Sequence, residues 1–129
     1  MPRCLIVSGD APVRDAIKVG LAQVRDMVVE TAADAWAIEL VRAGSYDLVV
    51  ADAQLADGTD GVEFLRDVQA ASPATLLALA TSAKPQARVL ARDRTEVDVC
   101  AFFRVPITTA EFYRTLARVV ERLGAAIVA

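Results

Sequence analysis

The 129-residue sequence predicts an α/β fold, a three-layer sandwich in which helices cover both faces of a parallel β-sheet. Two observations support this prediction. Short apolar, β-branched runs recur five times, and longer segments with apolar residues at helical spacing alternate with them. Because such crossovers are right-handed, strict alternation leaves few other packings. The length is that of one domain, and we expect residues 1–129 to form a single domain.

Five apolar runs are predicted to be strands. They are mostly continuous rather than alternating, which is typical of strands buried on both faces. In chain order they are residues 4–7, 27–29, 48–51, 76–80 and 97–103.

The helices are predicted from apolar residues spaced three or four positions apart. The two clearest stripes consist of Val13, Ile17, Leu21 and Val24 and of Phe112, Leu116, Val120 and Leu123. Residues 34–43 and 61–71 are predicted as further helices, ended by Gly44 and by Ser72-Pro73. A fifth helix is expected over residues 84–94.

The composition excludes several classes of protein. With 55% apolar and 24% charged residues, the chain can form a core and does not resemble a disordered chain. No apolar run approaches the ~20 residues of a membrane span, and Asp10 interrupts the first apolar stretch, so we expect a cytoplasmic protein without a membrane partner.

Histidine is absent, and the only cysteines are Cys4 and Cys100. A zinc cage, a Ser-His-Asp triad, a Cys-His pair and a disulfide framework all lack their parts. Both cysteines are expected to be small buried apolar residues, and most hydrolase chemistry is excluded.

The formal net charge of -3 is unevenly distributed. Residues 1–83 hold 6 basic and 12 acidic residues, whereas residues 84–129 hold 8 basic and 5 acidic residues. An acidic protein has no long-range attraction for nucleic acid, so no direct nucleic-acid partner is expected.

Parallel sheets place their ligand sites at the carboxyl ends of the strands. The residues predicted at these ends are Ser8, Gly9, Asp10, Asp52, Thr81, Val105 and Pro106.

Several short motifs follow one another along the chain, at these strand ends and in the segments next to them. They are Leu5-Ile6-Val7 with Val13-Arg14, Tyr46-Asp47-Leu48-Val49-Val50-Ala51-Asp52, Asp60-Gly61-Val62-Glu63-Phe64-Leu65-Arg66, Thr81, Phe102 and Pro106. In these motifs the chain resembles, over nearly its whole length, the receiver domain of bacterial two-component response regulators. The resemblance implies a flavodoxin-like topology with strand order 2-1-3-4-5 and a role in phosphorelay signalling rather than enzymatic activity. In that order the strands of Cys4 and Cys100 are not neighbours, so no disulfide is expected.

The resemblance also implies a site. In receivers an aspartate that ends the third strand accepts a phosphoryl group from a histidine kinase, and Asp52 matches it. Family members hold Mg²⁺ with an acidic pair and carry a lysine after the fifth strand, but here these positions are Ser8, Gly9 and Val105. Thr81 keeps the hydroxyl position, and Phe102 keeps the aromatic switch position without a hydroxyl.

The residues leave alternatives open. Asp52 is either a phosphoryl acceptor or a strand-ending carboxylate that accepts loop hydrogen bonds. Phe102 is either a switch or a core residue. No resident cofactor is expected. Asp10 and Asp52 are the remaining candidate Mg²⁺ ligands. Asp57 lies nearby, in the segment from Asp52 to Asp60, which is one residue longer than is usual in the family.

Three functions follow. The first is a degenerate receiver that binds a sensor kinase or another signalling protein, with weak or absent Mg²⁺-dependent phosphorylation. The second is an ordinary receiver that is phosphorylated on Asp52. The third is a flavodoxin-like enzyme or nucleotide-binding protein, although the first turn, at Ser8-Gly9-Asp10-Ala11-Pro12, is not a Gly-rich phosphate cradle.

Arginines are frequent in the last third of the chain. They are Arg88, Arg92, Arg104, Arg114, Arg118 and Arg122. In receivers the fourth helix, fifth strand and fifth helix form a partner or dimer face, so these residues are expected either to form such a face, including a homodimer, or to be a solvated charged surface. The resemblance also predicts a cis peptide bond before Pro106.

Overall fold

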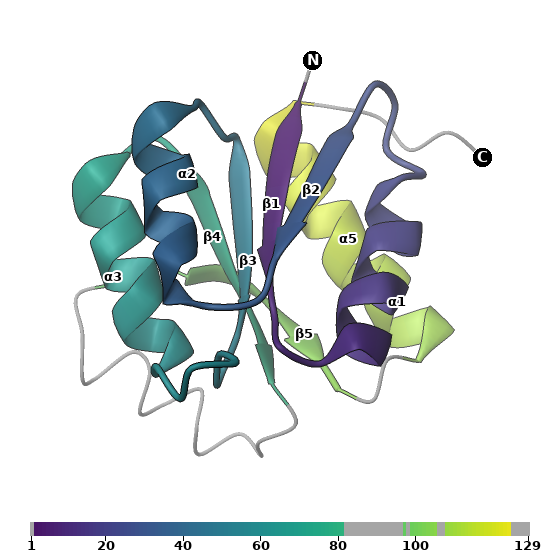
Figure 1. The fold of residues 1–129 in the computed structure, drawn as a ribbon. Coiled ribbons are helices and arrows are strands. Elements are labelled where there is room, and N and C mark those ends of the chain that lie inside the picture. Colours follow the sequence, from purple (N-terminus) through teal and green to yellow (C-terminus); the bar gives the residue numbers. More distant parts are fainter. Residues whose placement is uncertain (1, 82–96, 98, 106–107, 125–129) are drawn as a thin grey trace.

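A computed structural model describes residues 2–81, 97, 99–105 and 108–124 (Figure 1). Its strands are β1 (Arg3–Val7), β2 (Val28–Ala32), β3 (Leu48–Asp52), β4 (Leu76–Thr81) and β5 (Val99–Arg104). Its helices are α1 (Ala11–Leu21), the 3-10 helix η1 (Ala35–Ala37), α2 (Ile38–Ala43), α3 (Gly61–Ala71) and α5 (Thr109–Leu123). The predicted helix over 84–94, with Arg88 and Arg92, and the peptide bond before Pro106 lie outside the described residues.

The five strands form one parallel sheet in the order β2-β1-β3-β4-β5. Figure 1 shows α2 and α3 on one face of the sheet and α1 and α5 on the other. The predicted three-layer architecture and strand order are therefore confirmed.

Each face of the sheet has its own apolar core. Alternate residues of β3 point into the two cores: Leu48 and Val50 pack on the side of α1 and α5, and Val49 and Ala51 pack on the side of α2 and α3. All four are fully buried. The run is continuously apolar because helices cover this central strand on both faces.

The second strand differs from the prediction. The apolar run at 27–29 predicts it too early, because the observed strand runs from Val28 to Ala32 and includes Glu30 and Thr31. This strand is at the edge of the sheet, and Val28 and Thr31 are exposed. An edge strand is less buried than a central one, so an apolar run does not mark its limits.

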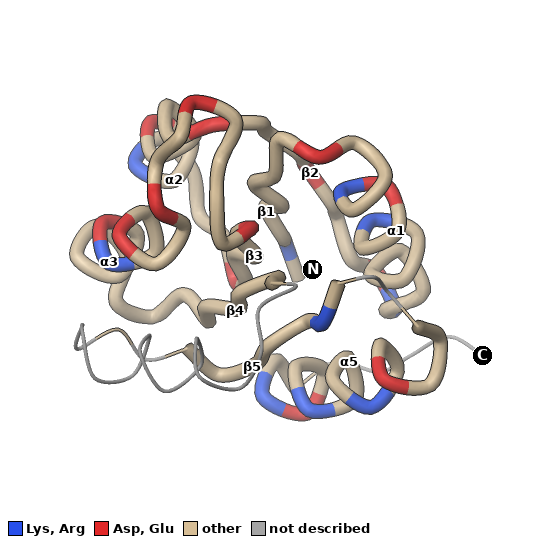
Figure 2. Tube along the Cα trace, turned by 90° about the horizontal axis from the view of Figure 1, so that it is seen from below, with Lys and Arg blue, Asp and Glu red and all other residues tan. Residues whose placement is uncertain are grey.

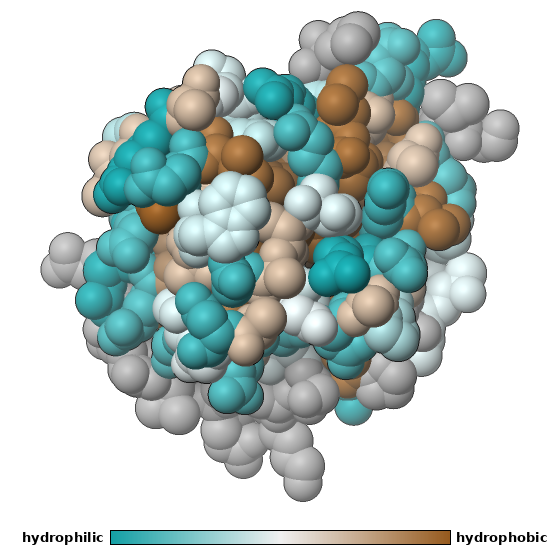
Figure 3. Space-filling model, viewed as in Figure 1, coloured by the Kyte–Doolittle hydropathy of each residue, from teal (hydrophilic) through white to brown (hydrophobic). Residues whose placement is uncertain are grey.

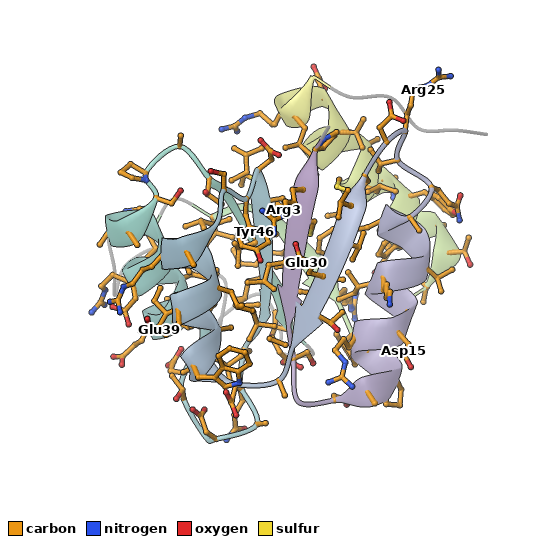
Figure 4. The ribbon with its side chains drawn as sticks, turned by 45° about the horizontal axis from the view of Figure 1, so that its top comes forward. Arg3, Asp15, Arg25, Glu30, Glu39 and Tyr46 are labelled. Carbon is orange, nitrogen blue, oxygen red and sulfur yellow. The ribbon has the colours of Figure 1, made fainter. Side chains whose placement is uncertain are left out.

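A polar cluster links this edge to the next strands (Figure 4). Arg3 Nε lies 2.7 Å from Glu30 Oε2, and the Tyr46 hydroxyl donates to Glu30 Oε1 at 3.3 Å. The Arg3 guanidinium carbon lies 4.7 Å from the centre of the Tyr46 ring. Burial, followed by the charge of Glu30, raises the pKa of Tyr46.

The helix starts show which polar residues serve as caps. Asp10 Oδ1 accepts the Val13 N–H at 3.3 Å before α1, and Asp60 Oδ1 accepts the Val62 N–H at 2.8 Å before α3. Thr108 begins α5 without a side-chain cap hydrogen bond.

Cys4 and Cys100 are not joined by a disulfide, as predicted; Cys4 is fully buried, but Cys100 is half-buried, so the prediction that both are buried is wrong for Cys100. Among the helices of the described part of the chain, none has both the length and the apolarity required to cross a membrane.

Candidate functional site

The carboxyl ends of β1, β3 and β4 bring Ser8, Asp52 and Thr81 to one edge of the sheet. Asp52 pairs in register with Ala80, the residue before Thr81. Ser8 and Thr81 are buried, whereas Asp52 is half-buried. Val105 follows β5, where its N–H donates to the Thr81 carbonyl at 3.1 Å, and its side chain packs against the core beside α1 and α5.

Ser8 makes the central contact of this edge. Its hydroxyl donates to Asp52 Oδ2 at 2.9 Å, and Ser8 Oγ accepts the Asp10 N–H at 3.1 Å. The hydroxyl has a single proton, and the shorter contact assigns it to the carboxylate. A buried neutral donor therefore holds the Asp52 carboxylate at a place where receivers have an acidic side chain.

Gly9 is exposed to solvent, but it lies against the loop between β3 and α3. A Cβ atom on Gly9 would lie 2.8 Å from both Cα and Cβ of Ala56 and 3.0 Å from its backbone nitrogen. Ala56 is held in place because its N–H donates to the Ala33 carbonyl at 3.0 Å. The space in which the second acidic side chain would begin is thus occupied by backbone.

The other candidate carboxylates have local structural roles. Asp10 is the cap of α1. Asp57 Oδ2 accepts the Ala35 N–H at 3.3 Å, and Asp57 Oδ1 accepts the Thr59 N–H at 3.0 Å. Hydrogen bonds from Thr59, first from its side chain and then from its backbone, lower the pKa of Asp57. Within the described ranges, no three His, Cys, Asp or Glu side chains are grouped so as to hold a metal ion.

Two further residues belong to the site and were not predicted. Arg14 Nη1 donates to the Ser8 carbonyl at 2.9 Å and so fixes the end of β1 from α1. Gly61 allows α3 to start directly against Asp52, because a Cβ there would overlap the Asp52 carbonyl. Spacing gives no signal for either contact. The role of Asp10, in contrast, could have been predicted from Asp10-Ala11-Pro12, since a helix cap followed by proline is a common helix start.

Phe102 lies on β5, half-buried, and packs against the core beside α2 and α3. Its carbonyl accepts the Thr115 hydroxyl at 3.5 Å. These contacts agree with the alternative that Phe102 is a core residue.

The described arginines of the last third lie on β5 and α5. Arg114, Arg118 and Arg122 are exposed, and Figure 2 shows basic residues along α5. Arg104 Nη1 lies 3.6 Å from Glu111 Oε1, at an exposed position.

Comparison with protein-family models gives no match, and comparison with curated proteins gives no significant match. Solved structures do match. The non-phosphorylated receiver domain of HemR from Leptospira biflexa is 30% identical, with a TM-score of 0.76 over 93% of this chain and 94% of that domain. The chain belongs to the response regulator receiver family.

Two other structures share the fold of this receiver domain. A CheY-like receiver domain protein from Methanospirillum hungatei JF-1 is 23% identical, with a TM-score of 0.78 over 96% of this chain and 94% of that one. The beryllofluoride-activated NtrC4 receiver domain dimer is 21% identical, with a TM-score of 0.78 over 95% of this chain and 99% of that one.

Proposed function

We propose that this receiver domain acts as a signalling module by binding a sensor kinase or another signalling protein, and that its Mg²⁺-dependent phosphorylation is weak or absent. We expect no enzymatic turnover of its own. The hydrogen bond from Ser8 to Asp52 supports this proposal most directly, since it engages the carboxylate of the phospho-acceptor position.

The residues around Asp52 do not fit an Mg²⁺ ion held by an acidic pair. Mg²⁺ requires near-octahedral oxygen ligands and is usually bound through one or two carboxylates. Ser8 offers a hydroxyl that is already bonded to Asp52, and Gly9 has neither a side chain nor the space for one. Asp10 already accepts the N–H of Val13 in α1, and Asp57 already accepts the N–H groups of Ala35 in η1 and of Thr59.

Among the described residues of the site the only base is Arg14, and its guanidinium is bound to the Ser8 carbonyl. When a carboxylate attacks a phosphoryl group, positive charge must stabilise the equatorial oxygens. Val105 replaces the family's lysine and packs into the core, and the guanidinium of Arg104 pairs with Glu111 on α5. Thr81 and the position of Asp52 at the end of β3 favour the second candidate, an ordinary phospho-accepting receiver.

Intact-mass measurement after incubation with Mg²⁺ and a small acyl phosphate tests the proposal. Under conditions that saturate a standard receiver treated in parallel, we expect little or no phosphoryl mass on this chain. Asp52→Asn is the matched control, because it removes the acceptor oxygen and keeps the size of the side chain. Stoichiometric, hydroxylamine-labile phosphate that Asp52→Asn abolishes would establish the second candidate instead.

The partner face is proposed to include β5 and α5. Arg114, Arg118 and Arg122 lie four residues apart on one helix, where like charges repel, and an acidic partner or the acidic residues of a second copy would relieve this repulsion.

A further inference from the structure

Trp36 is the only tryptophan of the chain and lies in η1, which precedes α2 and whose Ala37 packs in the core beside α2 and α3. It is 56% exposed, although Ala37 beside it is fully buried in the core under α2. The face seen in Figure 3 carries separate hydrophobic groups among hydrophilic and neutral side chains rather than one continuous apolar patch.

The backbone that carries Trp36 is held in place. Asp34 Oδ1 accepts the Trp36 N–H at 3.3 Å, and the Asp34 carbonyl accepts the Ala37 N–H at 3.1 Å. The neighbouring loop adds two links, from Ala35 N–H to Asp57 Oδ2 at 3.3 Å and from Ala56 N–H to the Ala33 carbonyl at 3.0 Å. The indole is therefore presented by a backbone that is ordered before any partner binds, which lowers the entropic cost of binding.

The surroundings of Trp36 are acidic. Asp34 and Asp57 flank it, and Glu39 follows one helical turn later. No lysine or arginine occurs between Arg25 and Arg42 or between Arg42 and Arg66, and Arg42 pairs with Glu39 at 2.8 Å. An exposed aromatic ring on an acidic stretch of the chain attracts a cation, because the ring's quadrupole and the acidic charges act in the same direction.

We propose that the Trp36 surface, made of Trp36, Asp34, Glu39 and Asp57, is a docking site for a positively charged segment of a partner protein. An arginine or lysine side chain of that segment stacks on the indole, and the carboxylates attract its neighbours. The site is independent of the arginines on α5 and has the opposite charge, so the domain presents two partner surfaces.

A second copy of the chain could offer its own α5 arginines to this surface. Such a contact joins two different patches, so unless its rotation closes a ring it leaves one of each patch open at the ends and adds further copies. A basic segment of another protein fills the surface without this consequence.

The test uses the full chain and a synthetic peptide of alternating arginine and glycine. Because Trp36 is the only tryptophan, its fluorescence reports on this surface alone. We expect a saturable change in emission with the arginine peptide, weakened by salt, and no change with a matched glutamate peptide.

Calorimetry with the same peptide compares variants, including those without fluorescence. Trp36→Ala should weaken binding by about five- to thirtyfold, and Trp36→Phe by less, because it keeps an aromatic face. Glu39→Gln should weaken it more than Asp15→Asn, which lies on α1 across the sheet (Figure 4). Val19→Ala, at a residue that is 66% exposed, is the matched apolar control and should bind like the wild type.

Equal binding by wild type and Trp36→Ala, with circular dichroism showing that both are folded, would overturn the proposal. The proposal would also be overturned if Asp15→Asn weakened peptide binding as much as Glu39→Gln does, or if Val19→Ala weakened it as much as Trp36→Ala does. Light scattering of the protein alone gives the remaining outcome: growth in mass that Trp36→Ala abolishes would identify a second copy as the occupant and would also overturn it.

Discussion

The backbone of Ala56 lies against Gly9, so that a Cβ on Gly9 would be 2.8 Å from the Ala56 Cα. The missing acidic side chain and the position of the β3–α3 loop are therefore one structural feature. A carboxylate at this position requires the loop, which Ala33 and Ala35 hold through hydrogen bonds, to move away.

Substitution of Gly9 tests this relationship. Gly9→Ala should lower the free energy of unfolding by about 1–3 kcal/mol, the usual cost of overpacking, as measured in urea. Gly44→Ala is the matched control and should cost less, because its nearest contact, at 3.2 Å, is the flexible end of Arg3. Gly9→Asp should show no rise in Tm with millimolar Mg²⁺. A clear rise would mean that the loop yields and that a metal site can form.

The Ser8–Asp52 hydrogen bond should appear as a coupling energy. Ser8→Ala and Asp52→Ala, alone and together, form a double-mutant cycle, for which we expect about 1–2 kcal/mol of coupling because the acceptor is charged. A control cycle that combines Ser45→Ala, at an exposed serine, with Asp52→Ala should give a coupling energy near zero. Additive effects of Ser8→Ala and Asp52→Ala would show that the hydrogen bond does not stabilise the domain.

The α5 arginines should control association. Arg114→Glu with Arg118→Glu is expected to abolish salt-sensitive self-association or capture of an acidic partner, followed by light scattering at several salt concentrations. Arg42→Glu with Arg66→Glu, on α2 and α3, is the matched control. If only the control pair disrupts assembly, the partner face lies on α2 and α3.

The polar cluster at Tyr46 predicts a stability change in alkali. Burial raises the pKa of Tyr46, so near pH 10 the unfolded chain loses this proton while the folded chain retains it. The contribution of the protonated Tyr46 hydroxyl to the free energy of unfolding is complete below ~pH 10. It is lost as the pH rises through the higher pKa that Tyr46 has in the folded state. The difference in unfolding free energy between wild type and Tyr46→Phe should be constant at neutral pH and should shrink above ~pH 10. A difference that stays constant into alkali would contradict this.

The sequence predicts the architecture well, because the buried strands and the amphipathic helices carry strong periodic signals. Residues 61–71 are predicted and observed as a helix with the same limits. The limits of β2 are missed because an edge strand carries Glu30 and Thr31 as readily as apolar residues.

The sequence predicts which residues lie at the site, but not the contacts that they make. That Ser8, Asp52 and Thr81 meet at the end of the sheet follows from the alternation of strands and helices. Residue spacing does not predict how the loops pack against one another. Three contacts depend on that packing: the hydrogen bond from Ser8 to Asp52, the approach of the Ala56 backbone to Gly9, and the link between Arg14 and Ser8.

The sheet also implies how amide hydrogens exchange with deuterium. β3 lies between β1 and β4, and its residues Leu48–Ala51 are fully buried, so its amides should exchange only when the whole domain opens. β2 has a neighbour on one side only, and its amides should exchange through local fluctuations. The backbone amides that lead into Asp52 should therefore exchange far more slowly than those of the strand that precedes Trp36.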